Sequence, residues 1–132
     1  MPKNIGIAKG DVSVATGAGT GYVPGTSHEK SGVTGKLRLI TLLPSAGLAT
    51  DADVTITTTF TGQTIYNDTT VDLSSTTTAV EIPVAMDSLQ VDGTAGLSGS
   101  IQFPLFNDRF KVVVANATGT ATLTCTFLYD RD

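Results

Sequence analysis

The last quarter of the chain reads RFKVVVANATGTATLTCTFLY from Arg109 to Tyr129. Residues 110–115 and 121–129 both alternate with a period of two, which is typical of extended strands with one buried face. Between them, Asn116–Gly119 supplies residues that favour a turn. The stretch therefore predicts a β-hairpin whose core-facing side chains are Phe110, Val112, Val114, Ala121, Leu123, Cys125, Phe127 and Tyr129.

The remaining sequence predicts an all-β protein. Its 132 residues are the length of a single domain, and no window has the apolar spacing of a helix. About seven to eight strands with turn signals between them are typical of a β-sandwich or jelly roll. We assign this domain to residues 36–132.

Several strands can be placed individually. Lys36–Leu43 is expected to be a strand that is apolar on both faces in its second half, with Leu37, Leu39 and Leu43 on one side and Ile40 and Leu42 on the other. Asp53–Thr61 is expected to be half-buried through Val54, Ile56, Thr58 and Phe60. Strands at 79–86 and 101–106 contain Pro83 and Pro104, and proline favours the edge of a sheet. Residues 62–72 and 92–100 are interpreted as connections.

Residues 1–35 are predicted to form an extended N-terminal arm. The segment holds eight of the fourteen glycines, and such a composition has a large entropic cost of ordering. Its TGAGTG run, Thr16–Gly21, lacks the third glycine of a dinucleotide-binding loop and is interpreted as a flexible linker. The arm is expected to become ordered only on a partner.

Charge divides the chain unevenly. The net charge is −4, which argues against nucleic-acid binding, yet five of the eight basic residues lie at or before Arg38. A basic arm could contact the acidic body of an adjacent copy or the groove of another protein. The candidate partner-binding residues are Lys3, Lys9, Tyr22 and Lys30.

Residues for catalysis or metal binding are scarce. His28 is the only histidine, so no Ser-His or Cys-His pair is expected, and it is interpreted as an exposed loop residue. Cys125 is expected to be a buried structural thiol. Asp51 with Asp53, and Asp87 with Asp92, lack the spacing of a calcium loop and are interpreted as solvated turns. No cofactor or metal is predicted, and neither a signal peptide nor a membrane span is recognised.

The segment SIQFPLFNDRFKVVVANATGTATLTCTFLYD, from Ser100, resembles the C-terminal part of decoration (cement) proteins on tailed-bacteriophage capsids. The matching features are Phe103–Leu105, then Arg109 and Phe110, then Val112–Ala115, and the Thr-rich strand Gly119–Phe127. The segment DVTITTTFTGQTIYNDTTVDL is similar to their central strands. The resemblance implies a β-sandwich, commonly trimeric, that binds the major capsid protein on the capsid exterior where capsomers meet. It implies no active site.

Two functional classes therefore remain open. The first is a non-enzymatic virion protein that stabilises a capsid. The second is a phage tail or fibre adhesion module that binds a host glycan, which would need exposed aromatic rings for stacking. The arm distinguishes them, because its removal is expected to abolish capsid binding but not glycan binding.

Overall fold

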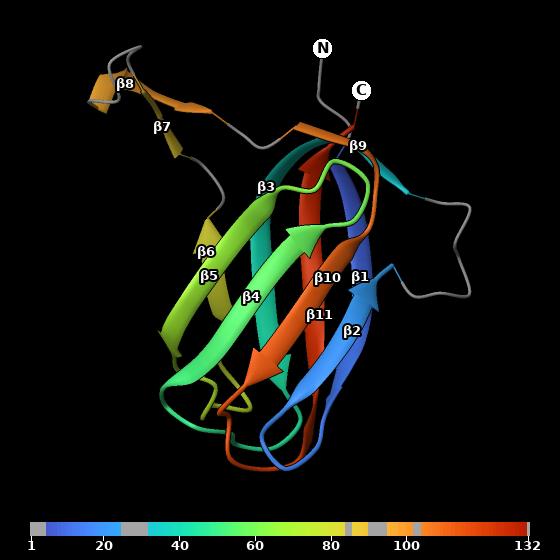
Figure 1. Ribbon diagram of the computed structural model, residues 1–132, viewed down its shortest axis with the longest axis vertical. Coiled ribbons are helices and arrows are strands. Elements are labelled where there is room, and N and C mark those ends of the chain that lie inside the picture. Colours follow the sequence, from blue (N-terminus) through green and yellow to red (C-terminus); the bar gives the residue numbers. More distant parts are fainter. Residues whose placement is uncertain (1–4, 25–31, 84–85, 90–94, 102–103, 132) are drawn as a thin grey trace.

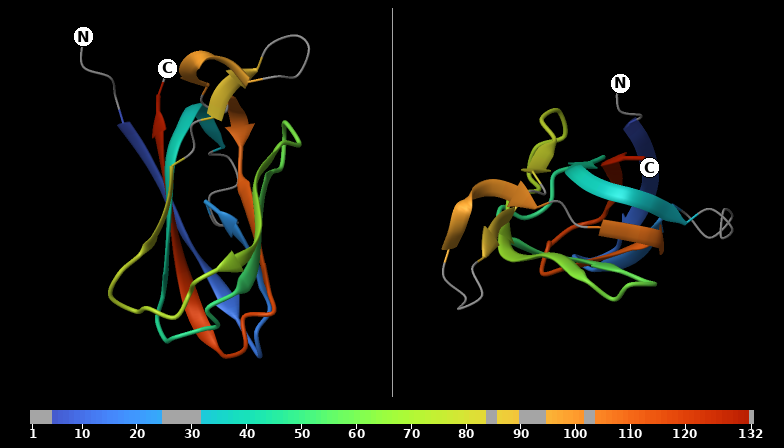
Figure 2. Two further views of the ribbon diagram at one scale, coloured as in Figure 1. Left: turned by 90° about the vertical axis from the view of Figure 1, so that its left-hand side faces the viewer. Right: turned by 90° about the horizontal axis from the view of Figure 1, so that it is seen from above.

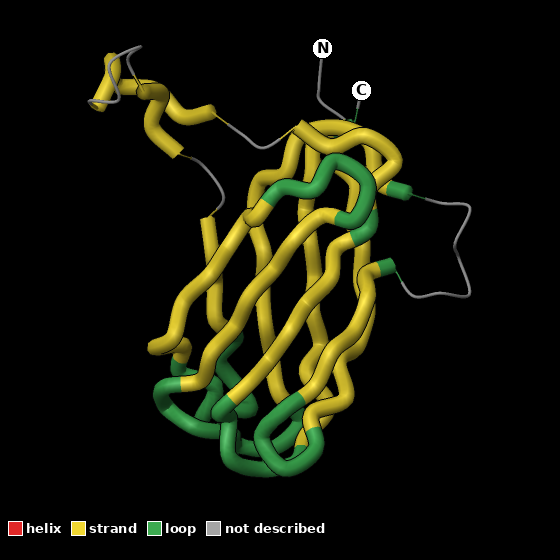
Figure 3. The backbone as a smooth tube through the Cα atoms, in the orientation of Figure 1, coloured by secondary structure: helices red, strands yellow, loops and turns green. Residues whose placement is uncertain are grey.

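The computed structural model describes residues 5–24, 32–83, 86–89, 95–101 and 104–131. Within these residues the regular elements are strands, which confirms the predicted all-β class (Figure 3). Two antiparallel sheets pack face to face as a β-sandwich (Figure 2). Strand β1 (Ile5–Val14) begins and strand β11 (Ala121–Asp130) ends at the same end of this sandwich (Figure 1), which we call the terminal end.

The larger sheet has five strands in the order β1-β11-β3-β6, with β9 also paired to β3. Its members are β1 (Ile5–Val14), β11 (Ala121–Asp130), β3 (Val33–Pro44), β6 (Val80–Pro83) and β9 (Pro104–Asp108). The smaller sheet has four strands in the order β2-β10-β4-β5. Its members are β2 (Gly19–Val23), β10 (Phe110–Ala115), β4 (Ala52–Thr58) and β5 (Thr64–Val71). Strands β7 (Met86–Leu89) and β8 (Ala95–Ile101) pair as a separate hairpin that stands away from both sheets (Figure 1).

The prediction of a C-terminal hairpin is wrong, although the prediction of which faces of its two strands point to the core is correct. Strand β10 pairs with β2 and β4, whereas β11 pairs with β1 and β3, so the two strands lie in opposite sheets. Their apolar faces meet across the core, where the rings of Phe110 and Phe127 stack at 4.0 Å between centroids. Alternation identifies the inward side chains of a strand, but it does not say which strand lies beside it.

The segment after β10 crosses between the sheets and is fixed there by backbone hydrogen bonds. The Ala117 N–H donates to the carbonyl of Gly17 (2.9 Å), and the Gly17 N–H donates to that of Gly119 (2.7 Å). Asn116 and Thr118 have φ values of 53° and 45°, which lie in the left-handed region. The crossing is therefore held by the turn that joins β1 to β2.

The predicted N-terminal arm is also wrong over residues 5–24 and 33–35, whereas residues 1–4 and 25–31 lie outside the described ranges. Strand β1 pairs with β11 over its whole length, β2 pairs with β10, and Val12, Val14 and Val23 are buried in the core. The TGAGTG run contains a tight turn rather than a flexible linker, because Ala15 and Ala18 exchange backbone hydrogen bonds around Thr16 and Gly17. In the described chain the sandwich thus includes strands from Ile5 onward, and the predicted boundary at Lys36 is wrong.

Close approach between strands explains why this part is rich in glycine. A Cβ on Gly19 would overlap the carbonyl oxygen of Ser13, and one on Gly21 would lie 2.8 Å from a methyl group of Val12. A Cβ on Gly6 would overlap the ring of Tyr129. Glycine is therefore needed at Gly19 and Gly21, where β2 meets β1 of the other sheet, and at Gly6, where the ring of Tyr129 from the neighbouring strand β11 takes the space.

A β-bulge changes which side chains of β3 face the core. Leu39 pairs with Leu128 and Leu37 with Tyr129, which leaves Arg38 as an extra residue. The bulge reverses the inward face, so Leu37 is buried before it and Ile40 and Leu42 after it. The predicted grouping of Leu37 with Leu39 and Leu43 is therefore wrong.

Other strands follow the predictions in part. Pro83 lies in β6 at the edge of the larger sheet, and Pro104 begins β9, which pairs only with β3 in the described chain, so both edge assignments are confirmed. The predicted connections 62–72 and 92–100 instead contain β5 and β8. Two register shifts between β4 and β5 account for the weak alternation of β5.

Substitution of Val112 tests the assignment of the core face. Val112 is fully buried between the sheets, so Val112→Asp is expected to lower the free energy of unfolding by about 3 to 5 kcal/mol, because the carboxylate would be buried without a partner. Lys111→Asp, on the outer face of the same strand, is the matched control and is expected to have a small effect. Urea denaturation would measure both, and equal midpoints would contradict the assignment.

Candidate functional site

The two ends of the sandwich differ in chemical character. The end opposite the terminal end is formed by turns rich in Gly, Ala, Ser and Thr, at residues 15–18, 45–51, 72–79 and 116–120. The large apolar side chains that the structure describes as exposed belong to the half nearer the terminal end, as the register of β1, β2 and β10 shows. They are Ile5, Ile7, Tyr22, Phe60 and Phe106.

An exposed aromatic pair is the main feature of the terminal end. Phe60, in the connection between β4 and β5, is 63% exposed, and Phe106, in β9, is 60% exposed. Their ring centroids are 5.7 Å apart and the rings are tilted by 53°, a favourable geometry for two aromatic side chains. The prediction that Phe60 faces the core is wrong, because β4 ends at Thr58 and the chain turns outward there.

Asp108 holds both phenylalanines in place. One carboxylate oxygen accepts hydrogen bonds from the N–H groups of Phe60 and Thr61, each at 2.9 Å. The other accepts from the Phe106 N–H (3.0 Å) and the Thr61 hydroxyl (2.9 Å). Asp108 is fully buried, and these four donors replace the water that a buried carboxylate loses. The aromatic pair is therefore carried on a rigid support.

Tyr22, a predicted partner-binding residue, lies on the outer face of β2. The guanidinium carbon of Arg109 is 5.6 Å from the centroid of its ring, and Arg109 Nε donates to the carbonyl of Pro24 at 3.3 Å. The basic side chain thus supports the tyrosine ring through a cation–π contact.

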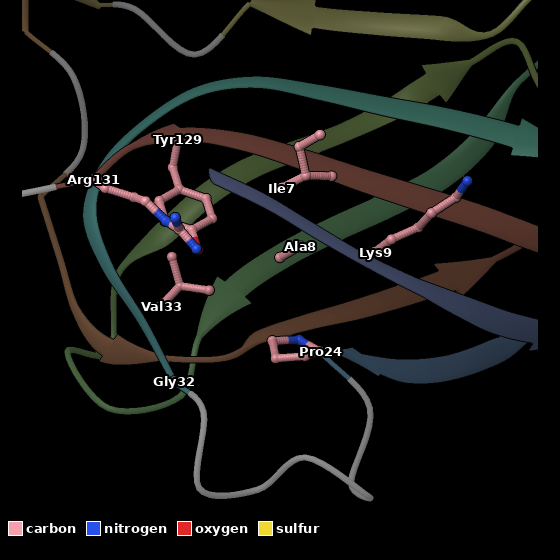
Figure 4. A pocket seen from close by; sticks show the side chains of 8 residues that line it. All are labelled: Ile7, Ala8, Lys9, Pro24, Gly32, Val33, Tyr129 and Arg131. Carbon is pink, nitrogen blue, oxygen red and sulfur yellow. The ribbon is translucent and has the colours of Figure 1, made fainter. Parts of the chain in front are cut away.

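Lys9, another predicted partner-binding residue, lines a cavity of about 470 Å³ beside β1 (Figure 4). The other lining residues are Ile7, Ala8, Pro24, Gly32, Val33, Tyr129 and Arg131. Lys3 and Lys30 lie outside the described residues, as does His28. Lys9 and Tyr22 therefore belong to neighbouring strands of opposite sheets rather than to a separate arm.

Cys125 and Asp53, which the sequence analysis also considered, lie in surroundings that suit a structural role. Burial, and to a lesser extent the charge of Asp11, raises the pKa of the Cys125 thiol to about 12. Asp53 accepts a hydrogen bond from the Asn116 side chain at 2.6 Å. The side chains of Asp87 and Asp92 are outside the described part. Within that part, no group of three His, Cys, Asp or Glu residues is arranged to hold a metal ion, and no helix could span a membrane.

The chain was compared with known proteins at the level of family, sequence and structure. No family model, no curated protein and no solved structure matches it.

Removal of one acceptor from Asp108 is expected to destabilise the terminal end. In Asp108→Asn an amide group would face donors where a carboxylate oxygen now accepts, so the free energy of unfolding should fall by about 1 to 3 kcal/mol. Asp72→Asn is the control, because Asp72 is exposed and bonds only locally to Ser74. If chemical denaturation gave the same decrease in the free energy of unfolding for both variants, the hydrogen bonds of Asp108 would not stabilise the terminal end more than an exposed local contact does.

The thiol of Cys125 is expected to resist modification in the folded protein. Its raised pKa leaves very little thiolate at pH 8, and burial blocks access, so reaction with a thiol reagent should be slow. In urea the same reaction should become fast. A fast reaction of the native protein would contradict the buried position of this side chain.

Proposed function

We propose that this protein is a non-enzymatic virion protein that binds the major capsid protein on the outside of a phage capsid, between capsomers, and stabilises the shell. The observation that carries the proposal is the exposed Phe60–Phe106 pair on its buried Asp108 support. The resemblance of the segment from Ser100 to capsid decoration proteins supports the same role. A homotrimer is the favoured assembly on the capsid.

The aromatic pair suits a protein–protein contact for energetic reasons. Aromatic side chains bury a large area and supply much of the affinity at protein interfaces. A pair that is already ordered loses little conformational entropy on binding. Four hydrogen bonds to Asp108 fix the backbone that carries both rings before any partner arrives.

The alternative is a tail or fibre adhesion module that binds a host glycan. The same observation keeps this alternative open, because exposed aromatic rings also stack on sugars. Deletion of residues 1–35 cannot separate the two functions as the sequence suggested, since it would remove β1 and β2 from the sandwich. Point substitutions at the terminal end are required instead.

Phe60→Ala combined with Phe106→Ala is expected to weaken binding to capsids lacking this protein by about tenfold or more, because aromatic anchors of this kind are worth about 2 kcal/mol or more. Both rings are largely exposed, so the variant should keep its fold. Thr50→Ala combined with Thr77→Ala, at the opposite end, is the control and should bind like the wild type. Co-sedimentation with the capsids of the source phage would measure binding.

Capsid binding that is unchanged in the double phenylalanine variant would contradict the role of this pair. Binding of the wild type to a glycan but not to capsids would favour the adhesion alternative.

A further inference from the structure

The first part of β1 is an edge without a neighbouring strand in the described chain. Strand β1 lies at the end of the larger sheet and pairs with β11 on one side. On its other side, β2 approaches it only from Gly10 onward, because Gly10 lies against Val23, the last residue of β2. Among the residues that the structure describes, no strand pairs with the other side of residues 5–9, so the backbone N–H and C=O groups that point away from β11 are available to another strand.

Two other edge strands of the sandwich, β6 and β5, carry features that hinder strand addition and that residues 5–8 lack. Strand β6 contains Glu81 and Pro83, and β5 contains Asp68 and pairs irregularly with β4. Charges, prolines and irregular pairing are the usual means of blocking strand addition at an edge. Residues 5–9 read Ile-Gly-Ile-Ala-Lys and pair regularly with β11, with Ile7 65% exposed.

The cavity described above lies directly beside this open edge. Ile7 and Ala8 belong to both, and Val33, Pro24 and the ring of Tyr129 supply further apolar surface. Lys9 and Arg131 lie at opposite ends of the cavity (Figure 4), and no acidic residue of the described ranges lines it. On a chain with a net charge of −4, this is a local basic site.

We propose that this edge and cavity bind an extended acidic peptide segment of a partner protein. The segment adds a strand to residues 5–9 and places one apolar side chain in the cavity. Side chains two positions away on either side of it lie on the same face of an extended chain, so acidic residues there meet Lys9 and Arg131. This site is separate from the Phe60–Phe106 pair, so the proposal does not depend on the capsid role.

The test uses the full chain and the blocked peptide acetyl-Thr-Glu-Thr-Ile-Thr-Glu-Thr-amide. Titration monitored by NMR is expected to shift the amide signals of residues 5–9 and to saturate below about 1 mM peptide. Peptides with Lys in place of Glu, or Gly in place of Ile, should bind at least tenfold more weakly. Binding should also weaken as salt is added, which tests the charge contribution without any variant.

Strand addition and charge can be tested separately. N-methylation of the peptide at alternate residues should abolish binding in one set of positions and leave it unchanged in the other, because only one edge of an added strand bonds to β1. Lys9→Glu combined with Arg131→Glu should weaken binding about tenfold, whereas Lys111→Glu on the smaller sheet should not. The proposal is overturned if no binding occurs at about 1 mM, if the shifts map elsewhere, or if the chain itself dimerises through residues 5–9 instead.

Discussion

The apolar faces of β10 and β11 pack against each other across the sandwich, and the other strands are arranged around this contact. Phe110 and Phe127 stack between the sheets, and each of the two strands has partner strands on both sides in its own sheet. Strands β2 and β4 supply them in one layer, and β1 and β3 in the other. The glycine-rich N-terminal strands are therefore part of the core and not an accessory to it.

Much of the fold could be predicted from alternation, because a strand with one buried face must repeat every two residues. The inward positions of Val112, Leu123 and Cys125 were predicted in this way and are buried. The pairing could not be predicted, since a hairpin and a crossing between sheets bury the same side chains. The glycine-rich segment was predicted to be an arm because ordering glycine has an entropic cost. That cost exists, but Gly19 and Gly21 are needed where the backbones of two strands come very close.

The candidate site was largely hidden from sequence analysis. Lys9 and Tyr22 were predicted as surface contacts and are exposed, although on strands and not on an arm. The alternating pattern of β4 continues in the sequence to Phe60, beyond the end of the strand, so Phe60 was assigned to the core. The role of Asp108 depends on hydrogen-bond donors that are far away in the sequence. Its position between two predicted strands indicated only a local turn.

The terminal end thus combines features that suit a binding protein: an exposed pair of aromatic rings, a strand edge that no described strand covers, and a basic cavity. The most direct test of the proposed function is an electron-microscopy map of the source particle, compared with a particle that lacks this protein. The capsid role predicts sandwich-shaped density on the outside of the shell between capsomers, with the terminal end against the capsid surface. Density confined to the tail or its fibres would contradict it.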